Sequence, residues 1–472
     1  MFRLAYRLLG WLLRLAMVPV VARRHTPANA AAWLAPIVLL PVPGTVAYLL
    51  LARLGLERNA RKHRHVRDVI ERDDRLREQA GHRARLGVRR EQRDLVRLAE
   101  HLSTRQMGGF PILDGNAVEL LARPGEMVER LVADVDAARH HAHLMFFIWK
   151  DDRAGRRVAQ ALARAADRGV RCRVLVDAWA TRRMRASLGA WMRERGIAVH
   201  PMLAMHPLAR MDIRNHRKVA VVDGRVAYTG STNIHDPGSG LDGGVWHQVS
   251  ARVHGPTALQ LQMLFAEDWF FATGQVLDGP SVFPDPERPG DVAIQTVPGG
   301  PSYPAHTVQH VLVQAFAEAQ RQVVVTTPYL VPDEPVLLAL RLAALRGVRV
   351  DVVLPTRSDR PLADAAGRAY FQELLDAGVR IHLHSQGLLH AKTISVDRAF
   401  AVIGTANLDR RSLYLNYEDL LVLYDSACVD RLRTEQARWL RQARRVDADA
   451  WPSRSRMRAY AEHTAKLLSP VL

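Results

Sequence analysis

Two stretches of eighteen residues decide the fold: 216-HRKVAVVDGRVAYTGSTN-233 and 390-HAKTISVDRAFAVIGTAN-407. Both place a histidine, a lysine, an aspartate, a glycine and an asparagine at the same spacing, and both continue after the lysine with an apolar, β-branched run. Such runs predict strands. Residues two apart in a strand share a face, so each histidine is expected on the same side as its lysine. A chain that carries this element twice is expected to contain two related halves.

The duplicated side chains suit the chemistry of a phosphodiester, whose negative oxygens repel nucleophiles. The two lysines and the two asparagines can neutralise and hydrogen-bond these oxygens where negative charge develops. One neutral imidazole can attack phosphorus while the other, protonated, donates to the departing alkoxide. The lysines provide the positive charge that a metal would otherwise bring, so we expect neither a metal nor a cofactor. The candidate catalytic residues are His216, Lys218, Asp223, His390, Lys392 and Asp397, and the candidate phosphate ligands are Asn233 and Asn407.

The two aspartates of the motif have a second interpretation. Asp223 and Asp397 each stand between one strand-like run and the next, where aspartate commonly closes a turn. A structural role is therefore favoured over a role in proton transfer. Gly230 and Gly404 allow the backbone to turn so that the asparagines can reach the phosphate.

The composition shows a strong preference for arginine. Only five of the 66 basic residues are lysine, and two of these five are Lys218 and Lys392. Lysine carries a compact charge that the planar arginine fork does not replace, so its retention in the motif supports a functional role. A net charge of +18 indicates an anionic partner, either nucleic acid or acidic lipid. Cys172 and Cys428 lack the spacing of metal ligands and predict neither a zinc site nor a disulfide.

The duplicated motif resembles the signature of the phospholipase D superfamily, and neighbouring segments resemble its bacterial cardiolipin synthase branch. The likeness covers most of the chain and is carried by the segments 214-RNHRK-218, 327-TPYLVP-332, 388-LLHAKT-393, 408-LDRRS-412 and 416-NYE-418. The resemblance implies a transfer reaction in which a phosphatidyl group passes from one phosphatidylglycerol through histidine to a second one. The products would be cardiolipin and glycerol.

One position departs from the family pattern, in which an acidic residue follows each motif and orients the histidine of that motif. Glu418 has this position after His390, but Gln248 stands there after His216. We therefore expect Glu418 to orient His390 and to keep it protonated as the acid. His216, without a carboxylate partner, is expected to stay neutral and to attack phosphorus. Phosphate trapped on His390 would reverse this assignment, and a weakened or differently specialised site is the alternative.

Two apolar stretches at the N-terminus predict attachment to a membrane. Residues 32–52 contain no charged side chain over a length that suits one bilayer crossing. Residues 4–21 are also apolar, but Arg14 interrupts them, so this segment either spans the bilayer or lies along its surface. A cleaved signal peptide ending near Ala30 is the alternative. The basic cluster that follows marks the cytoplasmic side.

The predicted elements follow the same order in both halves. The first half is expected to contain a helix over 127–139, a strand over 143–149, a helix over 156–168 and a strand over 171–177, and the second half repeats them at 308–319, 322–328, 335–345 and 349–354. The expected fold is α/β, with two duplicated phospholipase D-like domains, each a mixed sheet flanked by helices, related by a pseudo-twofold and preceded by N-terminal membrane helices. The expected boundaries are 1–53 for the membrane anchor, 54–105 for a basic helical connector, 106–277 for the first domain, 278–304 for a proline-rich linker and 305–472 for the second domain with a C-terminal helix.

The sequence therefore predicts a membrane-bound phosphatidyltransferase that makes cardiolipin through a phosphohistidine. The alternatives are a phosphodiesterase of the same superfamily that hydrolyses phospholipid or nucleic acid, and a non-catalytic membrane scaffold. Aromatic residues make up 6% of the chain and do not alternate with basic ones as in a platform for stacked bases, so nucleic acid is not the expected partner. The expected partners are phosphatidylglycerol and the bacterial inner membrane, with the catalytic domains in the cytoplasm.

Overall fold

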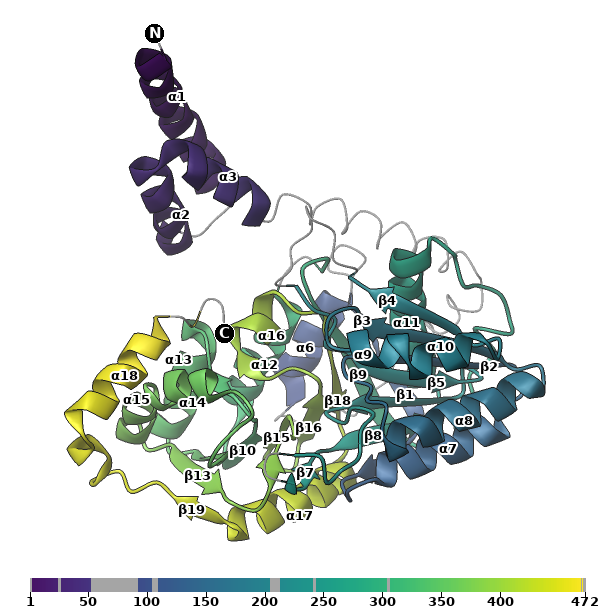
Figure 1. The fold of residues 1–472 in the computed structure, drawn as a ribbon. Coiled ribbons are helices and arrows are strands. Elements are labelled where there is room, and N and C mark those ends of the chain that lie inside the picture. Colours follow the sequence, from purple (N-terminus) through teal and green to yellow (C-terminus); the bar gives the residue numbers. More distant parts are fainter. Residues whose placement is uncertain are drawn as a thin grey trace. The chain divides into compact units, whose positions relative to one another are not determined.

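The computed structural model describes residues 2–23, 27–51, 92–103, 109–203, 213–240, 243–303, 306–467 and 469 (Figure 1). These residues form two compact units. The smaller unit contains the helices α1 (Phe2–Ala22), α2 (Pro27–Leu39) and α3 (Pro41–Leu51). The larger unit contains every described element from α6 (Arg93–Leu102) to α18 (Arg456–Lys466).

The apolar stretch 32–52 does not form one continuous helix. It is divided between α2 and α3, which meet at Leu40. Pro41 provides no backbone N–H, and the backbone at Gly44 packs so closely against α2 that a Cβ atom there would lie 2.4 Å from the carbonyl oxygen of Pro36. The crossing of a bilayer by residues 32–52 stays a prediction. Within the described residues, no helix combines the length and the apolar character needed to cross a bilayer.

A mixed sheet runs through the larger unit and contains both halves of the duplication. In the first half the strands lie in the order β4-β3-β2-β5-β6-β8-β1, and in the second half in the order β13-β12-β10-β15-β16-β18-β9, with β19 added at the edge. Antiparallel pairing of β1 with β9 joins the two series. The first-half strands are β1 (Ile112–Leu121), β2 (His141–Phe146), β3 (Arg171–Asp177), β4 (Ala198–Met202), β5 (Lys218–Val222), β6 (Val226–Gly230) and β8 (Ser250–His254). The second-half strands are β9 (Val292–Gly299), β10 (Gln322–Thr326), β12 (Arg349–Pro355), β13 (Arg380–His384), β15 (Thr393–Val396), β16 (Phe400–Gly404), β18 (Glu418–Leu423) and β19 (Ala443–Arg445).

Helices cover both faces of this sheet because alternate strand residues point to opposite sides. In β2, Leu144 and Phe146 pack with the apolar residues of α7 and α8, while His143 on the other face contacts Gln262 of α11. The first-half helices are α7 (Glu126–Ala137), α8 (Arg153–Asp167), α9 (Arg182–Ala186), α10 (Leu188–Arg193) and α11 (Thr257–Thr273). The second-half helices are α12 (Thr307–Glu318), α13 (Glu334–Leu345), α14 (Pro361–Arg368), α15 (Phe371–Asp376), α16 (Arg410–Tyr414) and α17 (Ser426–Arg441). Four short strands lie outside the main sheet: β7 (Trp246–His247), β11 (Leu330–Val331), β14 (Leu388–Leu389) and β17 (Leu408–Asp409).

Most of the predicted elements of the two halves are confirmed. The strand predicted over 171–177 is β3, and the helices predicted over 127–139 and 308–319 are α7 and α12. The strand predicted over 143–149 begins and ends earlier, as β2. The reason is that the backbone leaves the sheet after Phe146, and Lys150 donates its N–H to the carbonyl of Ile234 instead (2.9 Å).

The stretch 278–304 is more than a linker. It contains β9, which is buried along its whole length and pairs with β1 on one side and β18 on the other. Prolines and glycines surround an apolar run that is long enough for a strand, so the density of turn residues concealed it. The linker prediction is wrong for residues 292–299, and the two halves share one continuous sheet.

The segments at either end of the larger unit also pack into it. Most of the predicted connector 54–105 lies outside the described residues, but α6 at its end contributes apolar side chains to the core of the second half. These are Leu95, Val96, Ala99 and Leu102. The C-terminal stretch is helical in α17 and α18, as expected, and in addition forms the edge strand β19.

Candidate active site

The backbone at the first motif is hydrogen-bonded to the second half. The N–H of His216 donates to the carbonyl of Tyr417 (2.9 Å), and the N–H of Tyr417 donates to the carbonyl of Arg214 (2.9 Å). Tyr417 directly precedes Glu418, the acidic residue that follows the second motif. The first histidine is therefore held by the segment after the second motif.

The second motif shows the reciprocal arrangement. β14, which leads into His390, runs parallel to β7 of the first half. The N–H of His390 donates to the carbonyl of His247 (2.8 Å), and His247 directly precedes Gln248. Each motif histidine is thus positioned by the segment that follows the other motif.

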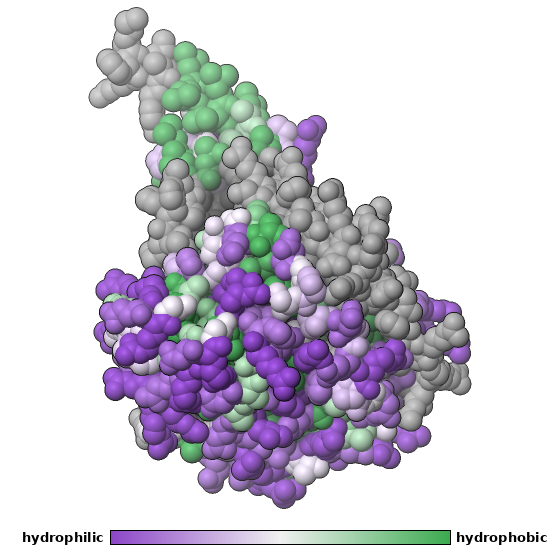
Figure 2. Space-filling view, turned by 90° about the vertical axis from the view of Figure 1, so that its right-hand side faces the viewer, coloured by the Kyte–Doolittle hydropathy of each residue, from purple (hydrophilic) through white to green (hydrophobic). Residues whose placement is uncertain are grey.

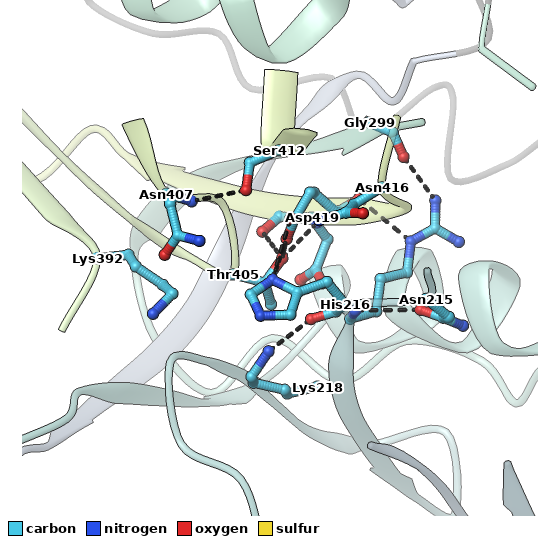
Figure 3. Close-up of polar contacts among 12 residues, drawn as sticks. Asn215, His216, Lys218, Gly299, Lys392, Thr405, Asn407, Ser412, Asn416 and Asp419 are labelled. Atoms are coloured by element: carbon cyan, nitrogen blue, oxygen red, sulfur yellow. Dashed lines mark hydrogen bonds and ion pairs between the residues drawn. The ribbon is translucent and has the colours of Figure 1, made fainter. Parts of the chain in front are cut away.

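Glu418 orients His216 and not His390. The Nδ1 atom of His216 lies 2.9 and 3.0 Å from the two carboxylate oxygens of Glu418, and the hydroxyl of Thr405 donates to the same carboxylate (2.6 Å) (Figure 3). A carboxylate only accepts, so Nδ1 carries the ring proton and Nε2 keeps its lone pair. The prediction that Glu418 orients His390 is wrong. The segment that follows each motif packs against the histidine of the other motif, and the order of residues along the chain does not show this.

Gln248 takes the matching place beside His390. Its amide nitrogen donates to the carbonyl of Ser231 (3.1 Å) and lies 3.5 Å from Nδ1 of His390. The Nζ atom of Lys392 lies 3.1 Å from the same ring nitrogen. Lys392 Nζ also lies 3.4 Å from Nε2, but both donors meet Nδ1 and the lysine is nearer to it. We therefore assign Nδ1 as the acceptor and the ring proton to Nε2. The two motif histidines therefore carry their protons on opposite nitrogens.

Burial dominates the electrostatics of these groups. It lowers the pKa of both histidines well below the ordinary value, and the neighbouring lysine charges lower it further. Burial also lowers the pKa of Lys218 to about 8, and that of Lys392 well below its usual range. The charge of Lys392 acts on His216 and the charge of Lys218 acts on His390, so groups from both halves interact in one site.

The lysine ammonium groups lack a full set of anionic partners. Lys218 donates to the carbonyl of His216 (2.6 Å), and Lys392 donates to that of His390 (2.9 Å). Glu418 supplies negative charge that favours both ammonium forms, although burial raises its own pKa. Figure 3 shows Lys392 of the second half near the His216 ring of the first. Each ammonium group has three N–H donors, so donors beyond those bound to the carbonyls can serve an anion.

The two candidate phosphate ligands differ. The Oδ1 atom of Asn233 accepts the N–H of Ile148 (3.0 Å), and its Nδ2 has no hydrogen-bond partner among the described residues, so this donor is available to a phosphate. The Nδ2 atom of Asn407 instead donates to Asp409 (2.9 Å). This bond engages one of its two N–H groups, and the phosphate-binding role of Asn407 stays a prediction.

Asp223 and Asp397 lie away from the histidines and hold backbone amides. The Asp223 carboxylate accepts the N–H groups of residues 139–141, and the Asp397 carboxylate accepts those of residues 320–322. Strand β5 separates Asp223 from Lys218, a length of roughly 17 Å at about 3.3 Å per residue. Their inclusion among the candidate catalytic residues is therefore corrected, and the structural role favoured by turn chemistry agrees with these contacts.

Sequence reasoning missed residues that support the site. Thr405 and Ser231 follow the two motif glycines, and a hydroxyl at this place in both copies was an available signal. Arg217 is fully buried, forms an ion pair with Asp268 of α11 (2.8 Å), and donates from Nε to the carbonyl of Glu418 (3.1 Å). The sequence feature that could have indicated Arg217 was an arginine just before an apolar run that predicts a strand. These contacts hold the segment that carries Glu418 against the first motif.

We expect the soluble phosphodiester dimethyl phosphate to bind about tenfold more weakly at pH 9 than at pH 7. The pKa of Lys218 is lowered to about 8, so its ammonium form is lost as the pH rises through this value and the attraction for an anion falls. Calorimetric titration at both pH values measures the change. Lys218→Arg keeps its charge at this position over the range and should lose less affinity between pH 7 and pH 9 than the wild-type protein. An unchanged affinity of the wild-type protein would contradict the prediction.

Comparison with known proteins agrees with this geometry. The family described as "Cardiolipin synthase, PLD-like domain" matches residues 131–269 and 312–439, the segments that deliver the two histidines. The chain is 35% identical to Cardiolipin synthase A of Erwinia tasmaniensis over 99% of both chains, and 34% identical to Cardiolipin synthase A of Klebsiella pneumoniae over 98% of both. The phosphatidylserine synthase of Haemophilus influenzae, at 14% identity, covers 80% of this chain and 100% of its own with a TM-score of 0.62, which shows a common fold. The chain therefore belongs to the cardiolipin synthase family of phospholipase D-like proteins.

Proposed function

We propose that this protein is a cardiolipin synthase that joins two phosphatidylglycerol molecules and releases glycerol. The observation that carries the proposal is the pair of buried histidines, one from each half, of which His216 meets a carboxylate and His390 meets the donors Gln248 and Lys392. Similarity over nearly the full length to proteins named Cardiolipin synthase A supports phospholipid as the substrate.

His216 is the nucleophile in this proposal. Its Nε2 lone pair attacks the phosphorus of the donor lipid, and the bond from phosphorus to the oxygen of the headgroup glycerol breaks. The Nε2 proton of His390 passes to that oxygen, and glycerol leaves. Attack leaves positive charge on the His216 ring, which the Glu418 carboxylate stabilises. The Lys392 ammonium beside Nδ1 gives a proton to that nitrogen as the Nε2 proton leaves, so the His390 ring stays neutral and does not become an imidazolate. Attack by His216 was also expected from the sequence, but for a different reason. The sequence suggested that His216 lacks a carboxylate partner, whereas in the structure His216 is the histidine that has one.

The acceptor lipid completes the reaction. A hydroxyl of the second phosphatidylglycerol gives its proton to His390 and its oxygen attacks phosphorus, so that the phosphorus–nitrogen bond breaks and cardiolipin forms. The lysines and the free Nδ2 of Asn233 stabilise the negative oxygens as charge develops. Only 8% of His216 and 5% of His390 is exposed, which limits the access of water that would give phosphatidic acid instead.

Purified protein in phosphatidylglycerol vesicles is expected to form cardiolipin and glycerol in equal amounts. His216→Ala and His390→Ala should each reduce the rate by at least about a thousandfold, because attack and protonation are both required. Mass spectrometry of the lipids and an enzymatic glycerol assay measure the products. The control is His463→Ala, which removes an exposed histidine on α18. Phosphatidic acid without cardiolipin would indicate hydrolysis, and nicking of added plasmid would indicate a nuclease.

The roles of the two histidines can be separated with a p-nitrophenyl phosphatidyl donor, whose leaving group needs no proton. His390→Ala is expected to release p-nitrophenolate and to retain the phosphatidyl group on His216, because attack is intact and only the acid is missing. His216→Ala should release none. Mass spectrometry after an alkaline quench locates the phosphate. Phosphate on His390 in the His216→Ala protein would contradict the assignment.

We also propose that the N-terminal unit anchors the protein in the bacterial inner membrane, with the larger unit on the cytoplasmic side. Hydrophobic residues cover much of the described surface of this unit (Figure 2). The exposed fractions of Trp11, Leu12 and Leu15 on α1 are 62%, 66% and 69%. Large exposed apolar patches mark contact with lipid or another protein. The basic cluster that follows in the sequence supports the cytoplasmic orientation.

Replacing Trp11, Leu12 and Leu15 together with serine is expected to reduce co-flotation with phosphatidylglycerol vesicles. Each apolar side chain transferred from water to lipid contributes about 1.5–3 kcal/mol, so the loss of three should release most of a surface-bound population. The matched control is a variant with Trp11→Phe, Leu12→Met and Leu15→Met, which keeps the apolar surface. Equal flotation of the serine variant and the wild-type protein would argue against insertion of this face.

A further inference from the structure

The proposed reaction requires two phosphates to lie close together. The acceptor phosphatidylglycerol carries its own phosphodiester, and a three-carbon glycerol bridge is all that separates it from the phosphorus under attack. The lysines of the motifs serve the transferred phosphate. A second anionic group at this distance needs a further cation, because two phosphates near each other in a partly buried site repel strongly.

Arg360 lies where such a cation is needed. It follows β12 and directly precedes α14, and its guanidinium lies over the ring of Tyr329, with Cζ 5.7 Å from the ring centroid. The Tyr329 ring in turn meets the ring of His390 edge-on, with centroids 6.3 Å apart. The hydroxyl of Tyr329 donates to Asp359 (2.5 Å), which fixes the ring in this position. One aromatic ring therefore separates the guanidinium from the proton-donating histidine.

The guanidinium of Arg360 is available to a ligand. Its backbone N–H is bonded to the Ser358 hydroxyl (3.0 Å), so the main chain is held, but the structure gives its side chain no hydrogen bond or ion pair with any described residue. The side chain is exposed. Its charge nevertheless lowers the pKa of His216 in the other half, so the field of Arg360 reaches the reacting centre.

Arg214, just before the first motif, also lies over an aromatic ring, but it is engaged differently. Its Cζ lies 5.8 Å from the centroid of Trp179, and its guanidinium donates to the carbonyl of Ile213 (2.9 Å). Its charge acts on the buried carboxyl of Asp177, whose pKa it lowers against the larger effect of burial. Arg214 is therefore partly committed within the protein, whereas the side chain of Arg360 keeps its donors for a ligand.

We propose that Arg360, positioned over Tyr329 beside His390, binds the phosphodiester of the acceptor lipid. The planar guanidinium offers two parallel N–H donors to phosphate oxygens, a geometry that lysine does not match. Binding there directs the acceptor hydroxyl toward His390 and the phosphorus on His216. The assignment rests on the proposed cardiolipin synthase function, and it distinguishes a lipid acceptor from an uncharged alcohol such as glycerol.

Two reactions of the full-length protein in phosphatidylglycerol vesicles test this assignment. Cardiolipin formation uses an acceptor with a phosphate, whereas exchange of labelled glycerol into phosphatidylglycerol uses the same donor and an acceptor without one. Arg360→Ala is expected to lower the ratio of the cardiolipin rate to the exchange rate about tenfold, which corresponds to the loss of one charged hydrogen-bonded contact. Arg360→Lys should restore the ratio in part, because the charge returns without the fork. Arg195→Ala is the control, since it removes an arginine that lies over Trp191, with Cζ 3.9 Å from the ring centroid, outside the site.

Each outcome has a defined meaning. An unchanged ratio in Arg360→Ala, or an equal loss of both reactions, would overturn the assignment while leaving the proposed function intact. A fall in the ratio for Arg214→Ala but not for Arg360→Ala would move the phosphate site to the first half. If the wild-type protein exchanges glycerol or releases phosphatidic acid but forms no cardiolipin, the proposed function fails and the acceptor site fails with it.

Discussion

The reciprocal pairing of the two motif segments is the interaction on which the site depends. The backbone before His216 binds Tyr417, and the backbone before His390 binds β7, so each half holds the histidine of the other. Without these hydrogen bonds Glu418 would have no defined position beside His216. The shared sheet reinforces the pairing, because β1 and β9 join the two halves edge to edge and restrict their relative movement. The hydrogen bonds that join the two halves are therefore the same ones that position the histidines.

The same arrangement explains how one duplicated motif can provide two different chemical functions. A carboxylate beside His216 places the ring proton on Nδ1, and donors beside His390 place it on Nε2. The sequence difference between Glu418 and Gln248 thus becomes a difference in tautomer. Burial lowers the pKa of both rings and of the lysines, so their charged forms are disfavoured in the free site, and a bound phosphodiester would favour them.

The sequence interpretation was most reliable where local patterns decide the structure. The pattern of apolar residues located β3 and the repeated helices. A helix that buries one face, or a strand that is fully buried, shows such a pattern whatever elements it packs against. It was wrong for β9, since proline and glycine around a short apolar run indicate turns, and only pairing with β1 and β18 makes that run a strand. In residues 32–52, Pro41 and the close packing at Gly44 divide an otherwise uniform apolar stretch between two helices.

The sequence by itself determined which residues are candidates for the chemistry. Matched spacing in two copies identified the histidines and lysines, and the turn preference of aspartate indicated the structural role of Asp223 and Asp397. The tertiary structure alone decided which partner each residue meets. Glu418 follows the second motif along the chain but serves the histidine of the first, 202 positions away. Spacing along a strand governs which side chains share a face, whereas contacts between distant segments depend on how the halves associate. That association results from sheet pairing and burial summed over both halves, and no local pattern records it.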